Sequence, residues 1–343
     1  MSSFDLCGRR VGTDEPPLVI AEVGINHEGS YEKALRMVHD AHAAGCECVK
    51  FQCHVVDDEM VPNRVIPANA KESIWDIMVR CSLTREEEVL LKREVESLGM
   101  IYLSTPFSRA AALRLESMGV GAYKIGSGEC NNDPLLRLVA SFGKPVILST
   151  GMNDLTSVQR AAAILRTAGV PFALMHCTSM YPTPYDKVRL PALADLAKAF
   201  PDTVLGLSDH SLGNYTCLGA VALGARILEK HFTSDMSWPG PDVPISIDPE
   251  GLADLIRGSR AIQLAMRGSK TVLAEEEPTI RFAYASVVAT RDIAAGDVLT
   301  EDNVWVKRPG TGEIPARRYD EVLGRRAARD IPTNRQLAWG DLG

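Results

Sequence analysis

Short apolar runs alternate with amphipathic segments over the first three-quarters of the chain. Each run is rich in aliphatic side chains, and the segment after it has apolar residues at helical spacing. Nearly continuous apolar runs predict strands that are buried on both faces, as in a parallel sheet covered by helices. We count eight such runs, at residues 18–23, 48–52, 101–105, 122–126, 145–149, 172–176, 204–208 and 225–231.

The amphipathic segments predict helices at residues 31–44, 85–97, 108–117, 134–142, 154–168, 188–200, 214–223 and 249–267. Eight strand–helix units within roughly 250 residues are typical of a (β/α)8 TIM barrel. A doubly wound open sheet is the alternative, and it is disfavoured because no Gly-x-Gly-x-x-Gly turn follows any run. We therefore predict an α/β fold with a barrel domain over residues 1–270.

Two segments depart from this pattern. Residues 55–82 contain prolines, charges and isolated aromatic side chains, and they predict an extended loop that either closes over a substrate or is decoration. Residues 271–285 are interpreted as a linker, and residues 286–343 contain short apolar runs separated by Gly, Pro, Asn and Asp. We predict a small, mostly β second domain that needs support from the barrel or from another subunit.

Composition narrows the class of protein. Of 343 residues, 45% are hydrophobic and 24% are charged, and the formal net charge is −7. An acidic chain gives no reason to expect a nucleic-acid or anionic-membrane partner. The sequence contains no recognisable signal peptide or membrane span, and its eight cysteines form no Cys-x-x-Cys pair. We expect a cytoplasmic enzyme with reduced thiols.

Polar side chains end the eight runs, and in a barrel these points converge on one mouth. Two cations, Lys50 and Lys124, are accompanied by the hydroxyl groups of Thr105, Ser127, Ser149 and Ser208. This set suits a small ligand that carries a phosphate and a carboxylate. Because burying an unpaired ammonium is costly, Lys50 within an apolar run favours a functional role.

Two histidines, His210 and His231, end neighbouring runs. A pair of imidazoles is a common ligand set for divalent transition metals, so we predict a metal site there. The sequence also places at or near the mouth four carboxylates for proton transfer or for support of the metal ligands: Glu22, Glu129, Asp209 and Asp242. His176 ends the sixth run at the same mouth.

Structural interpretations of the same residues remain open. A lone histidine at a strand end is more often a hydrogen-bonded structural group than a ligand. The charged residues can also pair among themselves, as Lys50 with Glu22, Lys124 with Glu129 and Lys230 with Glu229. The functional interpretation therefore depends on the whole set of residues.

Eight motifs at the strand ends read, in order, AEVGINHEG, KFQ, STPF, KIGSGE, ILSTGM, HCTSMYPTP, GLSDHSLG and LEKHFT. In this order they resemble the motifs of the N-acetylneuraminate (sialic acid) synthase family of bacterial type. The segment from Ser286 onward is similar to the antifreeze-like (SAF) domain of that family. The resemblance covers nearly the whole chain. It implies that phosphoenolpyruvate condenses with N-acetylmannosamine and water to give N-acetylneuraminate and phosphate.

The resemblance also assigns roles. Phosphoenolpyruvate contacts match Lys50, Thr105, Lys124, Ser127, Ser149 and Ser208, and metal ligands match His210 and His231, with Mn²⁺ expected and Mg²⁺ or Co²⁺ as alternatives. Sugar contacts and proton-transfer groups match Glu22, Gln52, Glu129, Tyr181 and Asp242. The expected catalytic residues are Glu22, Lys50, Lys124 and Glu129.

Two further positions bear on substrate binding. In relatives the tail domain swaps across a homodimer and places an arginine over the partner's sugar, and Arg308 matches that arginine. Ser179 stands where relatives often have an asparagine that helps to hold phosphoenolpyruvate. Since serine is shorter but still a donor, we expect a rearranged contact with the anion at this position.

Three other functions are alternatives. A Schiff-base aldolase would use Lys50, Lys124 or Lys230 as its nucleophile. A sugar-binding protein without catalysis would release no phosphate. Within the family, a diacetamido-dideoxy hexose acceptor would give legionaminic or pseudaminic acid, whereas a phosphorylated acceptor would need additional cations.

Overall fold

The computed structural model describes residues 3–343. The chain forms two compact units, one ending at Arg267 and the other spanning Gly268–Gly343. The first unit contains a sheet of eight strands, all paired in parallel. The strands are β3 (Leu18–Gly24), β4 (Cys48–Cys53), β5 (Ile101–Pro106), β6 (Tyr123–Ile125), β7 (Val146–Ser149), β8 (Phe172–Cys177), β9 (Val204–Asp209) and β10 (Ile227–His231).

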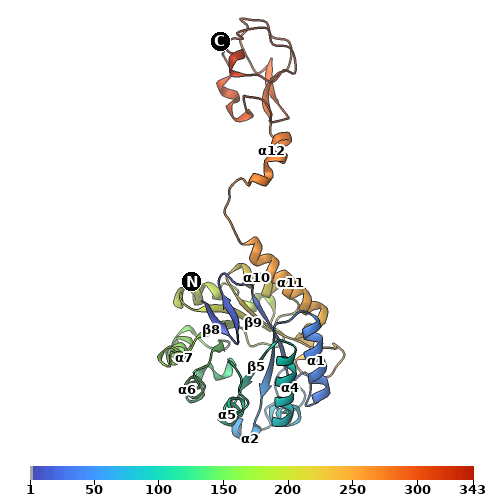
Figure 1. The fold of residues 1–343 in the computed structure, drawn as a ribbon, viewed down its shortest axis with the longest axis vertical. Coiled ribbons are helices and arrows are strands. Elements are labelled where there is room, and N and C mark those ends of the chain that lie inside the picture. The colour runs from blue at the N-terminus through green and yellow to red at the C-terminus, as the bar shows by residue number, and fades with distance from the viewer. Residues whose placement is uncertain (1–2) are drawn as a thin grey trace. The chain divides into compact units, whose positions relative to one another are not determined.

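These strands close into a cylinder. Their order is β5-β4-β3-β10-β9-β8-β7-β6, and the outermost strands β5 and β6 contact each other. Helices surround the strands (Figure 1). The predicted (β/α)8 barrel is confirmed, and each apolar run lies on one of its strands.

The helices of the first unit are α1 (Tyr31–Ala43), α2 (Val56–Glu59), α3 (Ile74–Cys81), α4 (Arg85–Ser97), α5 (Arg109–Ser117), α6 (Asp133–Ser141), α7 (Leu155–Thr167), α8 (Tyr185–Val188), α9 (Ala192–Ala199), α10 (Tyr215–Ala222) and α11 (Pro249–Ala265). Many begin at a side-chain cap directly after a loop. Ser30, Thr84 and Asp154, for example, each accept a hydrogen bond from a backbone N–H of the first turn. Such caps satisfy amide groups that have no partner within the helix.

The interior of the barrel is divided into an apolar end and a polar end. At the amino ends of the strands, Leu18, Ile20 and Leu103 belong to a buried cluster that includes Leu6 and Val11. These last two come from a hairpin of β1 (Ser3–Leu6) and β2 (Arg9–Gly12), which sequence analysis did not predict. The hairpin closes this end of the barrel with apolar side chains, so the open mouth is at the carboxyl ends of the strands.

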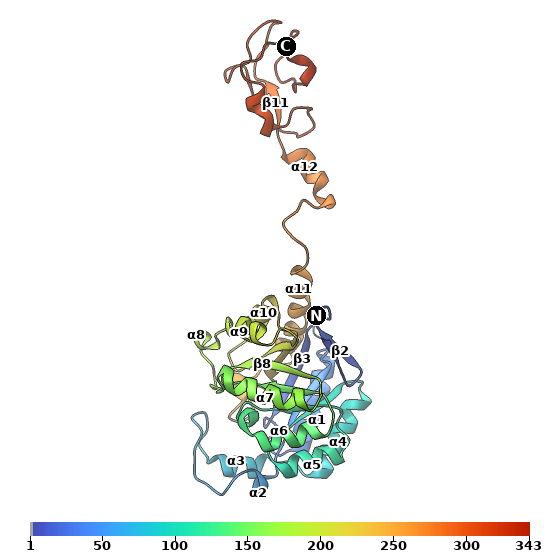
Figure 2. The ribbon, with the colours of Figure 1, turned by 90° about the vertical axis from the view of Figure 1, so that its left-hand side faces the viewer.

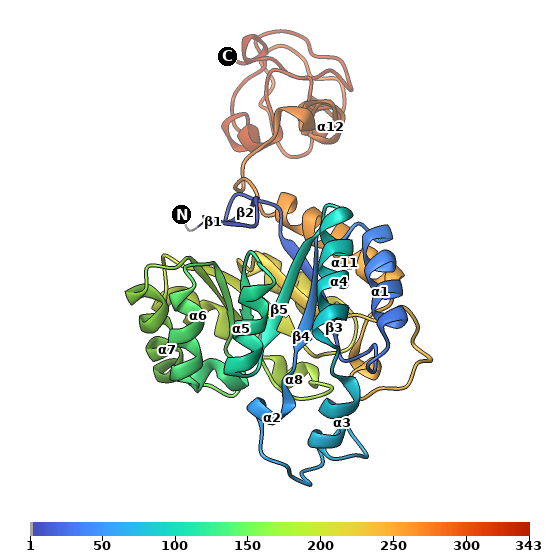
Figure 3. The same cartoon turned by 60° about the horizontal axis from the view of Figure 1, so that its bottom comes forward.

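The predicted extended loop after the second strand is partly helical. Within residues 55–82, α2 and α3 flank a segment, residues 60–73, that has neither helix nor strand. Figure 2 shows this segment at the edge of the barrel beside α2 and α3, and Figure 3 shows it at the end where β4 leads into α2.

The second unit is mostly irregular, with one antiparallel pair of strands, β11 (Ser286–Ala289) and β12 (Val304–Lys307). It also has α12 (Glu277–Ala283) and short 3-10 turns. Its own apolar core includes Val287, Val304, Ile314 and Leu337. Arg308 directly follows β12, and its predicted role above a partner's sugar stays a prediction.

No helix in the described part of the chain is long and apolar enough to cross a membrane. All eight cysteines are free thiols, and seven of them are buried.

Candidate active site

Alternation along the strands decides which side chains enter the barrel. Glu22 lies opposite Lys50 on β3 and β4, and His231 lies opposite Glu22 on β10 and β3. In a barrel, alternate residues of each strand point inward. The polar residues at the carboxyl ends therefore form a layer above the apolar one.

A buried network of two lysines and two glutamates forms the floor of this layer. Lys50 Nζ lies 2.8 Å from Glu22 Oε2 and 3.6 Å from Glu229 Oε1, and Lys124 Nζ lies 3.6 Å from Glu229 Oε2. None of the four side chains is more than 7% exposed. Each ammonium therefore has a carboxylate that offsets its desolvation.

The pKa values in this network follow from burial and charge. Burial lowers the pKa of Lys124, whereas at Lys50 the two carboxylates outweigh burial and raise the pKa. Burial favours the neutral form of Glu229, but the two lysines prevail and lower its pKa. At Glu22, burial prevails over Lys50 and raises the pKa. Glu229 is thus the carboxylate that the network holds most firmly in its ionised form.

Hydroxyl groups surround the network inside a cavity of about 280 Å³. Thr105 Oγ1 accepts a hydrogen bond from Lys50 at 3.2 Å, and Ser149 Oγ accepts one from Lys124 at 2.6 Å. Ser208 donates to Glu229 at 3.2 Å. The cavity therefore presents ammonium and hydroxyl donors together, as a compact anion requires.

The backbone of Gly151 holds Ser127, one of the residues that line this cavity. Its N–H donates to Ser127 Oγ at 3.0 Å. A Cβ at Gly151 would lie 2.8 Å from the same oxygen, so only glycine permits this close approach. Ser179 lines the cavity as well, with its Oγ 3.8 Å from Cys177 Sγ.

Glu129 lines the cavity but forms no ion pair with a lysine or an arginine in the described structure. Its Oε2 is buried and has no hydrogen-bond partner. Burial raises its pKa to about 7. A carboxyl group with a pKa near neutrality can both accept and return a proton, which suits a general base.

His210 and His231 face each other at the mouth, with ring centroids 5.4 Å apart. His210 Nδ1 lies 3.1 Å from the carbonyl oxygen of Thr178 and donates to it. Burial lowers the pKa of His210, but its contacts with Cys177 and with this carbonyl prevail and raise the pKa, so Nε2 has to give up a proton before it can bind a metal. His231 is kept neutral because burial lowers its pKa well below the ordinary value, and its buried Nδ1 has no partner. A metal requires neutral imidazoles with a free nitrogen, a condition that His231 meets directly and that His210 meets once it has lost a proton.

The two imidazoles therefore fit a divalent ion. Within residues 3–343, no group of three or more His, Cys, Asp or Glu side chains is arranged as a complete metal site. A metal held by two histidines would leave positions open for substrate or water.

A second, outer pocket of about 620 Å³ adjoins the cavity, and the two share Gln52, Phe107, Ser179, Tyr181 and His231. Asp242 lies at its edge, 3.8 Å from His231 Nδ1, and burial raises the pKa of Asp242 to about 6. Its walls are mixed, and their apolar part comes from the mouth and from the 60–73 segment, α3 and nearby loops: Ile25, Pro67, Ala68, Ala70, Ile74, Ile77, Met78 and Pro241. None of the residues that line this pocket is Lys or Arg.

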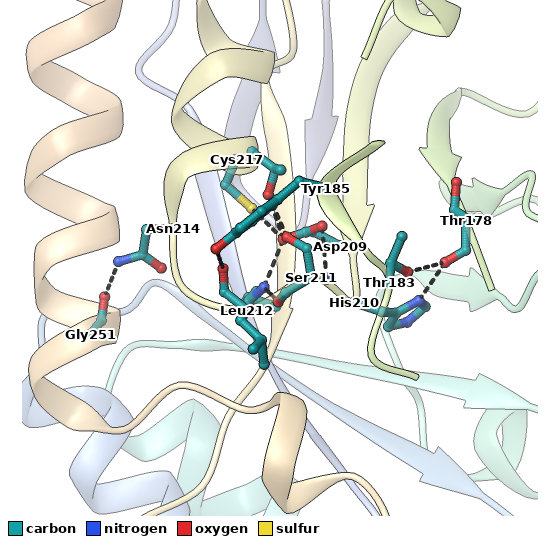
Figure 4. A network of polar contacts seen from close by, with 12 residues as sticks. Thr178, Thr183, Tyr185, Asp209, His210, Ser211, Leu212, Asn214, Cys217 and Gly251 are labelled. Carbon is teal, nitrogen blue, oxygen red and sulfur yellow. Dashed lines mark hydrogen bonds and ion pairs between the residues drawn. The ribbon is translucent and has the colours of Figure 1, made fainter. Parts of the chain in front are cut away.

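Two residues that sequence analysis placed at the mouth, Asp209 and His176, point elsewhere. Asp209 faces outward and pairs with Lys230 at 2.7 Å, and it also accepts hydrogen bonds from Ser211 and Thr216. Figure 4 shows Asp209 beside Ser211 and Cys217, while the ring of His210 turns toward Thr178. His176 contacts the carbonyl oxygen of Val188 at 2.6 Å.

Glu229 was missed as a site residue because it was interpreted as a partner of Lys230. That pairing is wrong, since neighbours on a strand point to opposite faces. Strict alternation back from His231 would have placed Glu229 inside the barrel. Lys124 likewise pairs with Glu229, and the suggested pair with Glu129 does not form in the described structure.

The fold and this site define a TIM-barrel protein with a polar mouth that can hold an anion beside a metal. Comparison with known proteins gives the family. The NeuB family model matches residues 37–271, and the SAF domain model matches residues 284–343. The chain is 36% identical to N,N'-diacetyllegionaminic acid synthase of Campylobacter jejuni, covering 91% of this chain and 96% of that one.

Two other proteins extend the comparison. Human N-acetylneuraminate-9-phosphate synthase is 32% identical, covering 89% of this chain and 87% of that one. The crystal structure of a sialic acid synthetase from Leptospira borgpetersenii in complex with citrate has a TM-score of 0.75 at 32% identity, covering 81% of this chain and 95% of that one. The chain belongs to the NeuB family of sialic acid synthases and carries a SAF domain.

Proposed function

We propose that this protein condenses phosphoenolpyruvate with an unphosphorylated N-acetylated amino sugar and water, forming a nine-carbon sialic-acid-type 2-keto acid and phosphate. The observation that carries the proposal is the buried floor, where Lys50 and Lys124 flank Glu229 beneath a ring of hydroxyl groups. Paired ammonium and hydroxyl donors suit the carboxylate and phosphate of a small dianion or trianion.

Residues of the inner cavity would hold the donor substrate. Lys50, Lys124 and the hydroxyls of Thr105, Ser127, Ser149, Ser179 and Ser208 bind phosphoenolpyruvate with its C3 facing the outer pocket. A divalent ion on His210 and His231, for which we propose Mn²⁺ with Mg²⁺ or Co²⁺ as alternatives, would supply Lewis acidity at the carbonyl oxygen of the acceptor.

The reaction would then proceed without a covalent enzyme adduct. C3 of phosphoenolpyruvate forms a bond to the aldehyde carbon, and water adds at C2 as positive charge develops there. The aldehyde oxygen becomes an alkoxide and takes up one proton, which is balanced by the proton that Glu129 accepts from the attacking water. C2 then carries a hydroxyl group and the phosphate. As the C2–O bond to phosphate breaks, that hydroxyl gives up its proton to the leaving phosphate and C2 becomes the ketone. Positioning two reactants side by side supplies about 7–11 kcal/mol in favourable cases. A Schiff-base aldolase is less favoured, because Lys50, Lys124 and Lys230 each pair with a carboxylate.

Gln52, Tyr181, Asp242 and Glu22 would contact the acceptor in or beside the outer pocket. We further propose that Arg308 reaches this pocket from the partner subunit of a domain-swapped homodimer, as the family resemblance implies. This chain's own lining of the outer pocket contains no Lys or Arg, so Arg308 would be the single guanidinium there, which disfavours a phosphorylated sugar that needs additional cations.

The apolar residues of the outer pocket also help to decide which unphosphorylated sugar is the acceptor. Sequence analysis preferred N-acetylmannosamine. Ile25, Ile74, Ile77 and Met78 offer an apolar surface that suits a second N-acetyl methyl group and a deoxy carbon better than free hydroxyls. We therefore favour a diacetamido-dideoxy hexose, which gives legionaminic or pseudaminic acid, and keep N-acetylmannosamine as the second candidate.

Phosphate release from phosphoenolpyruvate tests both parts of the proposal. Purified protein with Mn²⁺ is given each acceptor, with and without EDTA. We expect metal-dependent release, faster with the diacetamido sugars. Release with N-acetylmannosamine alone would keep the reaction and overturn the choice of acceptor, and no release with any acceptor would overturn the reaction.

A further inference from the structure

The amide of Gln52, a residue shared by the two pockets, is held from two sides. Its Nε2 donates to Glu22 Oε1 at 2.8 Å, and its Oε1 lies 3.1 Å from His54 Nε2. The carboxylate of Glu22 takes the amide N–H, so the amide oxygen faces the imidazole. A hydrogen bond there requires that His54 Nε2 carry a proton.

His54 is itself fixed. Its Nδ1 lies 2.7 Å from Glu59 Oε2, and the two side chains are only 3% and 10% exposed. Its ring stacks on Phe107 with centroids 4.7 Å apart and an interplanar angle of 11°. Because the amide oxygen of Gln52 can only accept a hydrogen bond, Nε2 is the donor in that contact, while Nδ1 faces the carboxylate. The imidazole therefore presents a donor to Gln52.

Glu59 connects this arrangement to the outer pocket. It ends α2, and the preceding Asp58 accepts a hydrogen bond from the N–H of Ala110 at 2.7 Å, at the start of α5. The chain then continues into the 60–73 segment, whose Pro67, Ala68, Asn69 and Ala70 line the outer pocket. The imidazole of His54 thus contacts the amide of Gln52, the ring of Phe107 and Glu59, the residue directly before the segment that lines the outer pocket.

We propose that His54, held by Glu59, is a positioning residue that sets the orientation of Gln52 and Phe107 for binding of the acceptor sugar. The inference rests on the proposed function, in which the acceptor occupies the outer pocket. His54 lines neither the cavity nor the outer pocket, so it acts through the two residues that do. Lys50 is linked to His54 only indirectly, through Glu22 and Gln52, so we expect the binding of phosphoenolpyruvate to change much less than the binding of the acceptor.

Three substitutions at position 54 separate positioning from simple packing. His54→Leu removes both hydrogen bonds. The amide nitrogen of a glutamine reaches the place of Nε2, so His54→Gln keeps a donor for Gln52. His54→Asn reaches only the place of Nδ1 and keeps the contact with Glu59. His39→Gln is the matched control, because His39 pairs with Glu94 at 3.4 Å on the surface, where the histidine side chain is 49% exposed.

The experiment measures kcat and the KM of each substrate, together with calorimetric binding of the diacetamido sugar and of N-acetylmannosamine. Loss of one oriented hydrogen bond predicts about a tenfold rise of the acceptor KM in His54→Leu. The KM of phosphoenolpyruvate stays within about twofold in all variants. The acceptor KM of His54→Gln lies closer to the wild-type value than that of His54→Asn does. The acceptor KM of His39→Gln is unchanged.

Two results would overturn the inference: equal losses in the Gln and Asn variants, or an equal rise of both KM values. Failure of the proposed function looks different, because the wild type would then release no phosphate with any acceptor. In that case the calorimetric series still decides the role of His54. Sugar binding that weakens in His54→Leu and recovers in His54→Gln supports it, and binding that is absent or unchanged across the series rejects it.

Discussion

The inner cavity and the outer pocket are lined by residues from different structural elements. Strand ends form the cavity, and its lysines, glutamates and hydroxyls pair both between neighbouring strands and across the barrel interior. Loops and α3 form much of the outer pocket, whose walls contain apolar side chains beside polar groups and no Lys or Arg. A rigid sheet fixes donors for an anion that every member of such a family would need, whereas loops can vary to suit different acceptors. In the proposed function, the reaction would therefore take place in the inner cavity, and the choice of acceptor sugar would be made in the outer pocket.

The largest effect is expected where the two parts meet, at His231, which lines both. His231→Ala should lower kcat/KM by at least about a thousandfold, because a Lewis acid supplies several kcal/mol of charge stabilisation. Activity and calorimetric titration with Mn²⁺ check this, with His39→Ala as control. Full activity in metal-free buffer would contradict the role of the histidine pair.

A substitution at Glu229 tests whether the buried lysines and glutamates of the cavity floor stabilise one another as one network of charges. Glu229→Gln keeps the shape of the side chain but leaves Lys124 without a carboxylate partner. We expect the free energy of unfolding to fall by about 3 kcal/mol, as when one member of a buried ion pair is removed. Denaturant unfolding measures this change, and Glu94→Gln, at a surface pair, should change little. A loss as small as that of the control would mean that Glu229 is not a structural counter-ion.

Glu129 tests proton transfer within the cavity. Its raised pKa, about 7, means that the folded protein keeps this carboxyl neutral at lower pH. Since a general base must be ionised, kcat should rise with pH through about 7. Glu129→Gln should abolish this rise of kcat with pH and lower kcat by about a hundredfold.

The same group affects stability with the opposite sign. The stability that the neutral carboxyl contributes is present below the unfolded pKa and is lost as pH rises through about 7. Glu129→Gln should therefore be more stable than the wild type above pH 7, by about 2 kcal/mol, in thermal or denaturant unfolding at several pH values. Identical pH dependence of the two proteins would rule out a buried, titrating carboxyl at this position.

The smallest effect is expected at the wall of the outer pocket. Ile74→Ser should reduce the preference for diacetamido sugars over N-acetylmannosamine by about tenfold, the range of one lost apolar contact. Val79→Ser is the control, because Val79 lies on the same helix and is 54% exposed. Competition between the two acceptors gives the ratio directly. A shift of both acceptors by the same factor would contradict a selective wall.

The difference between the two parts also explains what the sequence could predict. Every barrel strand was predicted within a few residues, because parallel strands buried on both faces leave continuous apolar runs. The inner residues followed from their place at strand ends, and their assigned roles stay predictions. Asp209 and His176 were placed wrongly because their inward or outward direction depends on alternation, which was not applied there.

The outer pocket and the amino-terminal hairpin could not be predicted in this way. Ile25, Pro67 and Pro241 come together only in the folded chain, and no periodicity links them. The hairpin was missed because its strands are only four residues each, and only Leu6 and Val11 give it an apolar face. Position 54 was missed for a related reason, since its meaning depends on contacts with Glu59 and Phe107 that its neighbours in sequence do not reveal.

The central claim is that water attacks C2 of phosphoenolpyruvate after the new carbon–carbon bond forms, so that the C–O bond breaks. Turnover in H₂¹⁸O, followed by mass analysis of the released phosphate, tests it most directly. Phosphate without ¹⁸O, released only when an acceptor sugar is present, is the predicted result. Phosphate that carries ¹⁸O would mean that water attacks phosphorus, and it would contradict the condensation mechanism.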